Sequence, residues 1–468
     1  MITALDAKVM DANAAALGVG IDQLMDRAGA AVADLLKERY PGQRYGIFCG
    51  HGNNGGDGFA AALHLAGEQV TVILFDDPDR IRSPAAQQYF SQLKCPVKQF
   101  NDSAADFDVL VDAALGTGLN GELKTPYDRF VDLTRRFQGP VVSVDVPTGL
   151  GCTKHVVPTV TVTMYDAKEG MTAQNSGEIV KADIGFPPAA YERTGPGDFL
   201  RYPIPTKDSH KGANGSLLII GGGPYYGAPA MAGMAAMRIG ADLVTIATPE
   251  SSYHEVAAVS PVFILVKLKG KALSHEHVEQ LLALAENADA VLIGPGLGRS
   301  EDTFAAVNEF VAKCRKPMVI DADGLNALGG SFTAKQDQTV LTPHFREYQR
   351  LNGSVRTAND VKQMAARIGC TIVLKGREDI ISDGHRIKLN DTGTAGMTSA
   401  GTGDVLAGLI SGLLAKRMPA YEAGCLGAFI SGRAGELASA QYSYGMIATD
   451  VITAIASVLQ QNVRLPEH

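Results

Sequence analysis

Short apolar runs alternate with longer Ala-rich segments along most of the chain. In the first part the runs RYGIFC, QVTVILF, FDVLVDA and PVVSVDV occupy residues 44–49, 69–75, 107–113 and 140–146. A second series lies at residues 216–222, 242–248, 290–296, 317–322, 339–343 and 371–376. Continuous Val/Ile/Leu runs separated by helix-like segments are typical of parallel strands that are buried on both faces. The pattern therefore predicts an α/β protein, which ends in a long Ala/Gly-rich helical region from about Gly403.

One segment interrupts this alternation. Residues 186–215, FPPAAYERTGPGDFLRYPIPTKDSHKGANG, are dense in Pro, Gly and charge and have no apolar periodicity. Such composition is typical of an exposed connection between domains. We therefore predict two domains, residues 1–200 and residues 201–468.

Composition narrows the class of partner and compartment. The chain has 468 residues, of which 46% are hydrophobic, and a formal net charge of -8. A net negative charge gives no general attraction for nucleic acid or anionic membranes. The 6 cysteines lack CxxC or zinc-like spacing, no apolar run has the length of a membrane span, and the N-terminus lacks the basic-then-apolar order of a signal peptide. These features predict a cytoplasmic protein with neither a nucleic-acid nor a membrane partner.

The first candidate motif is GHGNNGGDGFAAAL, residues 50–63. Gly50, Gly52 and Gly55 have the G-x-G-x-x-G spacing, between a predicted strand and a predicted helix, and Asp76 follows at an offset of about 20 residues. This context favours a dinucleotide-binding loop, and the alternative is a tight strand-to-helix turn that binds nothing.

Asn53, Asn54 and Asp57 are additions that a phosphate loop does not need. A phosphate cradle uses backbone N–H groups at a helix N-terminus, whereas Asn side chains offer carbonyl oxygens that can bind a cation or orient a ring. The loop is therefore expected to hold more than a pyrophosphate.

Two further polar positions are expected at the same sheet edge. Asp112 ends one predicted strand, directly before GTGLNGE, and Asp145 ends the next, directly before Pro147 and Thr148. Ligands of parallel sheets bind outside the carboxyl ends of the strands. Asn54, Asp112 and Thr148 supply only oxygen ligands, which suit an alkali or alkaline-earth ion rather than zinc. The alternative is that both aspartates are helix caps or turn residues.

The combination NNGGDG, DAALGTGLNGE and SVDVPTG, with Lys168 in YDAKEG, resembles the epimerase domain of NAD(P)H-hydrate repair enzymes over residues 1–200. The resemblance implies that a damaged nicotinamide dinucleotide is the substrate. It implies potassium coordination by Asn54, Asp112 and Thr148, the last standing where Ser is frequent, and a proton-transfer role for Asp145. The implied substrate-binding residues of this domain are Asn53, Asn54, Gly55, Gly56, Asp57, Gly116, Thr117, Gly118, Leu119, Asn120, Gly121, Glu122 and Asp145.

The second half has no GxxxxGK[ST] and therefore no P-loop. Its strongest signal is TSAGTGDVLAGLISGLLA, in which Gly401 and Gly403 precede an apolar helix and Asp404 lies in the first turn. Free N–H groups at such a helix start stabilise a phosphoryl group during transfer, and the carboxylate can take the proton of an attacking hydroxyl. The alternative is an aspartate that only neutralises a helix N-terminus.

This segment resembles the signature of the ribokinase-like superfamily. With GGGPYYGAPAMAG, IGPGLG, LTPHFREY and VLKGREDIISDG it is similar to the ADP- or ATP-dependent NAD(P)H-hydrate dehydratase branch, from about Lys211 to the C-terminus. The resemblance implies Asp404 as the catalytic residue. The implied hydrate contacts are Ala228, Gly296, His344 and Asp404, and the implied adenine-nucleotide contacts are Lys375, Gly376, Arg377, Glu378, Asp379 and Gly403.

Two of these assignments have alternatives. Arg377, Glu378 and Asp379 stand where relatives often have small or hydroxyl residues, which puts nucleotide contacts there in doubt. His344 taken alone would be a structural histidine, but its place after Pro343, with Glu347 one turn later, favours the site.

Together these resemblances imply a Rossmann-like parallel-sheet sandwich followed by a ribokinase-like α/β/α domain. The first domain would epimerise the R and S forms of hydrated NADH or NADPH. The second would dehydrate the S form at the expense of ADP or ATP with Mg²⁺, in a homo-oligomer that also uses K⁺. Two other classes remain: a small-alcohol kinase fused to a dinucleotide module, and an interaction scaffold with an inactive first domain. The kinase would accumulate a phosphorylated alcohol, and the scaffold would not need Asp112 and Asp145.

Overall fold

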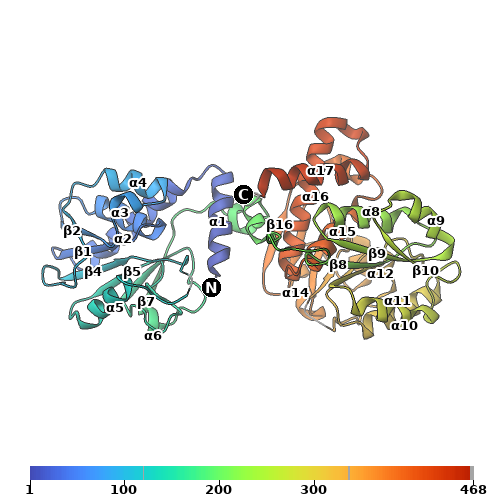
Figure 1. Ribbon diagram of the computed structural model, residues 1–468, viewed down its shortest axis with the longest axis horizontal. Coiled ribbons are helices and arrows are strands. Elements are labelled where there is room, and N and C mark those ends of the chain that lie inside the picture. Colours follow the sequence, from blue (N-terminus) through green and yellow to red (C-terminus); the bar gives the residue numbers. More distant parts are fainter. Residues whose placement is uncertain (120, 336–337, 464–468) are drawn as a thin grey trace. The chain divides into compact units, whose positions relative to one another are not determined.

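The computed structural model describes residues 1–119, 121–335 and 338–463 and divides into two compact units, Met1–Ala190 and Tyr191–His468 (Figure 1). Each unit is built around a mainly parallel sheet, so the α/β class and the presence of two parallel-sheet domains are confirmed. The division falls at residue 190 rather than at residue 200.

The first domain contains a parallel sheet with the strand order β3-β2-β1-β4-β5-β6-β7. Its strands are β1 (Arg44–Cys49), β2 (Gln69–Leu74), β3 (Val97–Gln99), β4 (Val109–Ala113), β5 (Val141–Val144), β6 (Val160–Met164) and β7 (Glu178–Ala182). Its helices are α1 (Ala4–Ala16), α2 (Ile21–Arg39), α3 (Asn53–His64), η1 (Pro78–Arg80), α4 (Pro84–Ser91), α5 (Tyr127–Arg136), α6 (Ala173–Ser176) and α7 (Ala189–Glu192), the last of which spans the division.

Both faces of this sheet are covered, and alternate side chains of one strand enter different cores. Ile47 of β1 packs with residues of α2, α3 and α4 on one face. Phe48 points to the other face, where its ring lies 4.7 Å from that of Phe130 on α5. Figure 1 shows α2, α3 and α4 on one side of the strands and α5 on the other. This two-sided burial explains why the strands appear in the sequence as apolar runs without alternation.

The second domain contains a sheet with the order β10-β9-β8-β11-β12-β13-β14-β15-β16, parallel as far as β14 and antiparallel beyond it. Its strands are β8 (Ser216–Ile220), β9 (Leu243–Pro249), β10 (Ile264–Leu268), β11 (Ala290–Ile293), β12 (Met318–Ile320), β13 (Thr339–Leu341), β14 (Thr371–Leu374), β15 (Asp379–Ser382) and β16 (Ile387–Asn390). Its helices are η2 (Pro196–Arg201), α8 (Gly227–Arg238), α9 (Glu250–Val259), η3 (His275–His277), α10 (Val278–Glu286), α11 (Glu301–Lys313), α12 (Asp323–Ala327), α13 (Phe345–Arg350), α14 (Ala358–Ile368), η4 (Ala395–Thr398), α15 (Thr402–Ala415), α16 (Ala420–Tyr442), η5 (Ser443–Gly445) and α17 (Ala448–Asn462).

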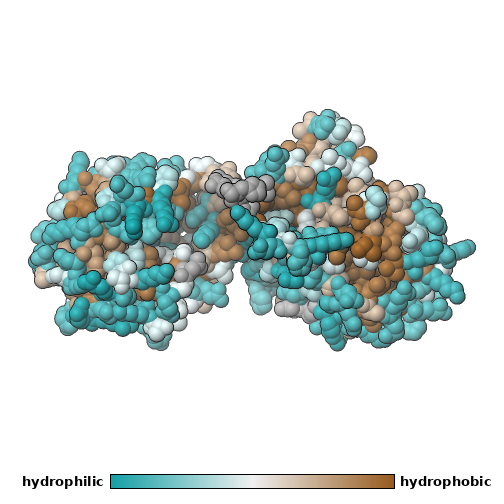
Figure 2. Space-filling model, in the orientation of Figure 1, coloured by the Kyte–Doolittle hydropathy of each residue, from teal (hydrophilic) through white to brown (hydrophobic). Residues whose placement is uncertain are grey.

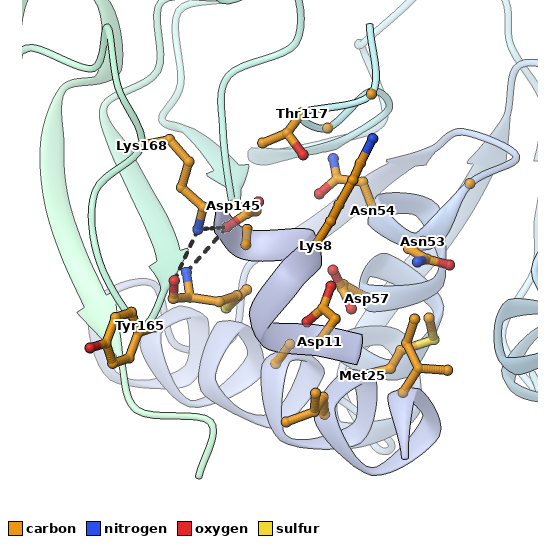
Figure 3. Close-up of a pocket in the computed structure, with 18 of the residues that line it drawn as sticks. Lys8, Asp11, Met25, Asn53, Asn54, Asp57, Thr117, Asp145, Tyr165 and Lys168 are labelled. Carbon is orange, nitrogen blue, oxygen red and sulfur yellow. Dashed lines mark hydrogen bonds and ion pairs between the residues drawn. The ribbon is translucent and has the colours of Figure 1, made fainter. Parts of the chain in front are cut away.

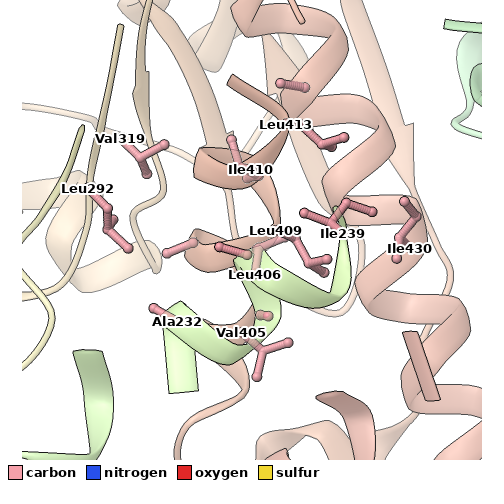
Figure 4. Packing of buried hydrophobic residues seen from close by; sticks show 14 of the residues in the cluster. Ala232, Ile239, Leu292, Val319, Val405, Leu406, Leu409, Ile410, Leu413 and Ile430 are labelled. Atoms are coloured by element: carbon pink, nitrogen blue, oxygen red, sulfur yellow. The ribbon is translucent and has the colours of Figure 1, made fainter. Parts of the chain in front are cut away.

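Helix α15 is the central element of the apolar core on one face of this sheet. Figure 4 shows Leu406, Leu409 and Ile410 of α15 packed between strand residues and α8. Gly408 permits the close approach of α8, since a Cβ there would lie 2.2 Å from the Ala232 carbonyl oxygen. The first turn of α15, which carries Asp404, is thereby fixed against the sheet.

The segment predicted as an exposed connection is partly built into the second domain. The backbone N–H of Thr194 donates to the Leu389 carbonyl at 2.8 Å, and Asp198 is paired with Lys388 at 2.7 Å. Thr194 and Asp198 are buried, and Phe199 joins the apolar core. The interpretation of the whole of residues 186–215 as a solvated linker is therefore wrong for its middle part.

Hydrophilic side chains cover most of the surface that Figure 2 shows, with apolar patches among them. Within the ranges that the structure describes, no helix is both long and apolar enough to cross a membrane.

Candidate functional site

A cavity of ≈ 520 Å³ lies in the first domain beyond the ends of β1, β4 and β5 (Figure 3). Its walls come from α1, α2, the start of α3 and the segments that follow these strands and β6. This is the sheet edge at which parallel α/β proteins bind ligands. The polar residues that line the cavity are Lys8, Asp11, His51, Asn53, Asn54, Asp57, Thr117, Asp145, Tyr165 and Lys168.

The glycine-rich loop shapes this cavity without lining it at every position. A Cβ on Gly55 would lie 2.0 Å from the Gly50 carbonyl oxygen, and a Cβ on Gly56 would clash with a side chain of α2. These two glycines therefore serve close packing, and neither lines the cavity. The residues of the loop that line the cavity are His51, Gly52, Asn53, Asn54 and Asp57.

Asp145 and Lys168 form an ion pair on the strand side of the cavity. Asp145 directly follows β5 with a φ of 63°, a left-handed conformation that Asp adopts more readily than most residues. The Lys168 ammonium is buried, and it also donates to the Met164 carbonyl at 2.9 Å and to Thr163 Oγ1 at 3.0 Å. Pairing and hydrogen bonds offset the cost of burying this charge.

Asp11 and Asp57 lie on the helix side of the same cavity. Asp11 comes from α1 and Asp57 from α3, and Figure 3 shows their carboxyl groups close to one another. Burial raises the pKa of Asp11 to about 6 and that of Asp57 well above its ordinary value, with the charge of Asp145 adding to both shifts. Sequence reasoning identified Asp57 but missed Asp11, because Asp11 lies on a helix that precedes the first strand and therefore follows no strand end.

The three residues expected to hold a cation lie around one buried network. Asp112 is fully buried and accepts hydrogen bonds from Ser143 Oγ at 2.8 Å, Thr148 N at 2.8 Å and Thr148 Oγ1 at 2.6 Å. Burial raises the pKa of Asp112, and these hydrogen bonds oppose that shift. The Leu115 N–H donates to Thr148 Oγ1 at 2.9 Å, which ties the loop after β4 to the same network.

Asn54 adjoins that loop and is left without partners. A Cβ on Gly116 would lie 3.3 Å from Asn54 Cβ, and neither amide atom of Asn54 has a hydrogen-bond partner among the residues described. A buried polar group without a partner destabilises the folded state unless a ligand or water satisfies it. The Asn54 amide is therefore available to a ligand.

The predicted contacts after β4 divide into two sets. The residues that line the cavity are Gly116, Thr117, Gly118 and Leu119, whereas Asn120 lies outside the described residues. Gly121 and Glu122 do not line it, and the Glu122 carboxylate instead accepts from Thr153 Oγ1 at 3.0 Å. Asp76, considered for a ribose hydroxyl, is paired with Arg80 at 3.0 Å and accepts from Tyr127 at 3.1 Å.

In the second domain, Asp404 occupies the first turn of α15, after Gly401 with a φ of 96°. Burial raises the pKa of Asp404 to about 7, and the negative charge of Asp321 adds to the shift. A carboxylate with such a pKa is suited to accept a proton near neutral pH.

The Lys375 ammonium lies next to this helix start. A Cβ on Gly403 would lie 3.5 Å from Lys375 Nζ, and Lys375 Nζ donates to Asp321 Oδ1 at 2.9 Å. Burial opposes the charged form of Lys375, but the charges of Asp321 and Glu347 outweigh it and hold its pKa above the ordinary value. The structure therefore brings Lys375, Gly403 and Asp404 together, and it adds Asp321, which sequence reasoning missed although it follows the apolar run of β12.

The other residues of the KGRED stretch form a turn between β14 and β15. Asp379 accepts from the Gly376 N–H at 2.9 Å and from Asn390 at 3.0 Å, so both of its oxygens are used within the protein. Glu378 pairs with Arg193 at 2.9 Å, and Arg377 is exposed.

His344 is the N-cap of α13. Its N–H donates to Glu347 Oε2 at 2.9 Å and its Nδ1 accepts from the Glu347 N–H at 3.1 Å, while half of its side chain is exposed. His344 also bridges to Lys375 through the backbone. His344 thus caps α13 on the strand end next to Lys375, and its contact with the hydrate stays a prediction.

Ala228 and Gly296 lie on two segments that touch one another. A Cβ on Gly296, which has a φ of 74°, would lie 2.1 Å from the Tyr225 carbonyl oxygen, directly before α8. The Gly222 N–H donates to the Pro295 carbonyl at 2.8 Å. Ala228 is in the first turn of α8, on the same side of the sheet as the first turn of α15.

Comparison with known proteins covers the whole chain. A family model described as NAD(P)H-hydrate dehydratase matches residues 217–457, and one described as YjeF-related protein N-terminus matches residues 21–170. A protein of Pyrobaculum aerophilum named bifunctional NAD(P)H-hydrate repair enzyme Nnr is 40% identical over 494 residues, covering 98% of each chain. A protein of the same name from Methanothermobacter thermautotrophicus is 39% identical, covering 97% of this chain and 94% of that one.

The second domain also resembles a solved structure. A ribokinase-like superfamily protein from Enterococcus faecalis is 28% identical, with a TM-score of 0.51, over 55% of this chain and 91% of that chain. The expectation of a ribokinase-like fold for this domain is confirmed.

Proposed function

The chain belongs to the family of bifunctional NAD(P)H-hydrate repair enzymes, and from this premise we propose how its residues divide the two reactions. The enzyme epimerises the R and S forms of hydrated NADH and NADPH and dehydrates the S form. The small-alcohol kinase is not favoured, because the similarity extends over both domains under one name.

The observation that carries the assignment of epimerisation is the cavity, which has the Asp145–Lys168 pair on one side. On the other side lie Asp11 and Asp57, whose carboxyl groups have no hydrogen bond or ion pair within the described part of the chain. The hydrated nicotinamide ring binds there, the C6 oxygen leaves as water, and water returns on the opposite face. Asp145 exchanges a proton with that oxygen. Asn53, Asn54, Asp57 and residues 116–119 form the wall that orients the ring.

Potassium would be held by Asn54, Asp112 and Thr148. The unpaired buried amide of Asn54 and the hard-oxygen character of all three groups fit an alkali cation. A bound cation supplies positive charge next to the loop after β4, and the chain's own part is to hold that loop through Thr148 and Leu115.

Asp404 is the base of the dehydration. It removes the proton of the C6 hydroxyl as the oxygen takes a phosphoryl group from ADP or ATP, and the ring nitrogen lone pair then expels phosphate. Phosphorylation converts hydroxide, a poor leaving group, into a good one. The N–H groups at the start of α15 and the Lys375 ammonium stabilise the charge of the transferred group.

Mg²⁺ would be bound mainly through nucleotide phosphates. Asp321 is engaged by Lys375 and Thr342, and Asp323 by Gly298 and Arg299. Of these three carboxylates, Asp404 is the one with no hydrogen bond or ion pair of its side chain among the residues described, and it would face the metal. Sites in which Mg²⁺ has one or two carboxylates and several phosphate oxygens are usual for nucleotide enzymes. Mg²⁺ supplies charge neutralisation during phosphoryl transfer.

Of the adenine-nucleotide contacts that the family resemblance implies, we retain Lys375 and Gly403. Asp379 and Glu378 serve the turn and the Arg193 pair, and Gly376 and Arg377 are exposed beside them. Hydrate contacts at Ala228, Gly296 and His344 stay predictions, as do a homo-oligomer and the cytoplasm as compartment.

One assay tests the proposal as a whole. The full chain is incubated with chemically hydrated NADPH, a mixture of R and S forms, and absorbance at the reduced-nicotinamide band is followed with and without ADP or ATP. Nucleotide-dependent recovery of all the NADPH is expected. Recovery of the S form alone would contradict epimerisation, and no recovery would contradict dehydration.

A further inference from the structure

Asp11 is a carboxylic acid for which the fold has no structural use. It lies within α1, past the first turn, where Thr3 and Asp6 already form the cap. No hydrogen bond or ion pair of Asp11 is found within the ranges that the structure describes. Asp inside a helix lowers helix stability, and a partly buried carboxyl without a partner is unfavourable. Such a group, set in a cavity, marks a functional position.

The placement of Asp11 is complementary to that of Asp145. Asp145 enters the cavity from the end of β5 with Lys168 beside it, whereas Asp11 enters from α1 with Asp57 beside it (Figure 3). One carboxylate is thus accompanied by a cation and the other by a second acid. The first environment favours an ionised group and the second favours a group that keeps a proton.

Epimerisation needs both kinds of group. The C6 oxygen leaves from one face of the ring and returns to the other, and a single carboxylate cannot reach both faces of a ring held in one orientation. A pair of groups with different protonation states, one on each face, meets this requirement.

We propose that Asp11 is the second catalytic residue of epimerisation and exchanges a proton with the C6 oxygen on the ring face opposite to Asp145. The inference rests on the proposed placement of epimerisation in this cavity. Asp57 is a positioning residue, because its carboxyl group lies beside that of Asp11 on the helix side of the cavity.

The proton balance is closed without any further reactant. When the leaving oxygen faces Asp11, Asp11 donates a proton, the C6–O bond breaks, and the N1 lone pair forms a C6=N1 iminium with release of water. A water on the other face then adds to C6, and Asp145 takes its proton while the electron pair returns to N1. One turnover in this direction leaves Asp11 ionised and Asp145 protonated, which is the starting state of the reverse reaction. Before a second turnover in the same direction, Asp145 gives a proton to bulk water and Asp11 takes one from it.

The test uses the full chain without nucleotide, so that dehydration is silent, and follows R/S interconversion by chromatographic separation of the two hydrates. Asp11→Asn should lower kcat by about 100-fold or more, the usual scale for loss of an acid–base group, with little change in KM. Asp11→Glu should restore part of the rate. Asp34→Asn, an exposed change on α2 with the same loss of charge, is the control and should match the wild type.

A pH profile separates chemistry from structure. The groups that face Asp11 are Lys8 on α1, Asp57 on α3, His51 after β1, and Asp145 with Lys168 on the strand side. Wild-type kcat should fall at alkaline pH as the exchanged proton is lost, and the residual rate of Asp11→Asn should not show this fall. A purely structural role would leave the shape of the profile unchanged.

The outcomes are distinct from those of the parent proposal. Absence of interconversion by the wild type would refute the proposed function. If Asp145→Asn is inactive while Asp11→Asn keeps more than about a third of the wild-type kcat, only the role of Asp11 is refuted. Asp11→Ser provides a second neutral variant, and failure of both neutral variants to fold would overturn the claim that Asp11 has no structural role.

Discussion

Lys375 Nζ lies 2.9 Å from Asp321 Oδ1, and Thr342 Oγ1 donates to the same oxygen at 2.8 Å. Asp321 is almost fully buried, so its negative charge acts strongly on its surroundings. It holds the Lys375 ammonium next to Gly403 and also raises the pKa of Asp404. One buried carboxylate therefore sets both the position of the cation and the basicity of the proposed catalytic residue.

Asp321→Asn should destabilise the second domain and shift the pH dependence of dehydration. Removing one partner of a buried ion pair costs on the order of 3 kcal/mol, and the neutral side chain no longer raises the pKa of Asp404. The rate profile should therefore move to lower pH. Denaturant unfolding and kcat measured from pH 5 to pH 9 check this, with Glu279→Gln, which breaks an exposed pair with Lys313, as control. An unshifted profile in a folded variant would show that Asp321 does not act on the catalytic base.

Asp404→Asn should abolish nucleotide-dependent dehydration and leave epimerisation intact. Loss of a general base lowers the rate by roughly 100-fold or more, while the change at the helix start costs about 1 kcal/mol or less. In the wild type, dehydration should rise with pH through about 7, because the deprotonated form of Asp404 is the active one. Both activities are measured beside the melting temperature. Equal loss of the two activities would contradict the division of labour between the domains.

The central strands could be predicted from the sequence because burial on both faces makes them continuous apolar runs. RYGIFC coincides with β1, and SLLIIGG begins with β8. Two strands at one end of each sheet were missed because their sequences lack a continuous apolar run. β6 (VTVTM) carries threonines, β7 is half-exposed, and the β15–β16 hairpin is antiparallel, so none has the apolar pattern of a central parallel strand.

Site residues could be predicted from the sequence where they directly follow a strand, because ligands of parallel sheets bind beyond the carboxyl ends of the strands. Asp145 and Asp404 follow from a carboxylate placed directly after a strand or in the first turn of a helix, and both lie where that rule puts them, whereas Asp57 was found through its glycine-rich motif. Asp11 could not be found in this way, because a helix that precedes the first strand reaches the cavity only through tertiary packing. Gly55, Gly56 and Asp379 match motifs in sequence, yet their geometry is used for packing and for a turn.

Asp11→Asn should leave the first domain nearly as stable as the wild type at about pH 4 and clearly more stable at pH 8. The folded-state pKa of Asp11 is raised from 3.8 to about 6, so the folded state binds the proton more tightly than the unfolded state. The free energy of unfolding of the wild type therefore falls as pH rises between these values. The Asn side chain of the variant does not ionise, so the variant does not show this fall. Melting temperatures of both proteins at the two pH values check it. A variant less stable than the wild type at pH 8 would mean that Asp11 makes a stabilising contact.

Cutting the chain after Ala190 should give two fragments that each fold. The cores of the two units are separate, and Thr194, Asp198 and Phe199 pack within the second. A cut at residue 200 would remove the Asp198–Lys388 pair and Phe199 from the second fragment and should lower its melting temperature. Circular dichroism and thermal melting of the fragments 1–190, 191–468 and 201–468 make the comparison. Equal melting of the last two would show that residues 191–200 contribute nothing to that domain.

Potassium should stabilise the first domain through Asn54 in a way that can be measured without any activity. A ligand that binds only the folded state at ten times its dissociation constant adds about 1.4 kcal/mol, which raises the melting temperature of a domain of this size by about 3–6 °C. Asn54→Ala is the appropriate variant because the Asn54 amide has no partner within the described part of the chain, so the change breaks no hydrogen bond. Replacing Asp112 would instead leave the groups of Thr148 and Ser143 that donate to it without a partner, and the loss of the ligand could not be separated from unfolding.

The measurement uses fragment 1–190, which is melted in KCl and in NaCl at equal ionic strength. The wild type and the neighbouring control Asn53→Ala should melt higher in KCl, and Asn54→Ala should melt at the same temperature in both salts. If Asn54→Ala still melts at a higher temperature in KCl than in NaCl, the cation binds at another place. If the wild type melts at the same temperature in both salts, the proposal of a potassium site is contradicted.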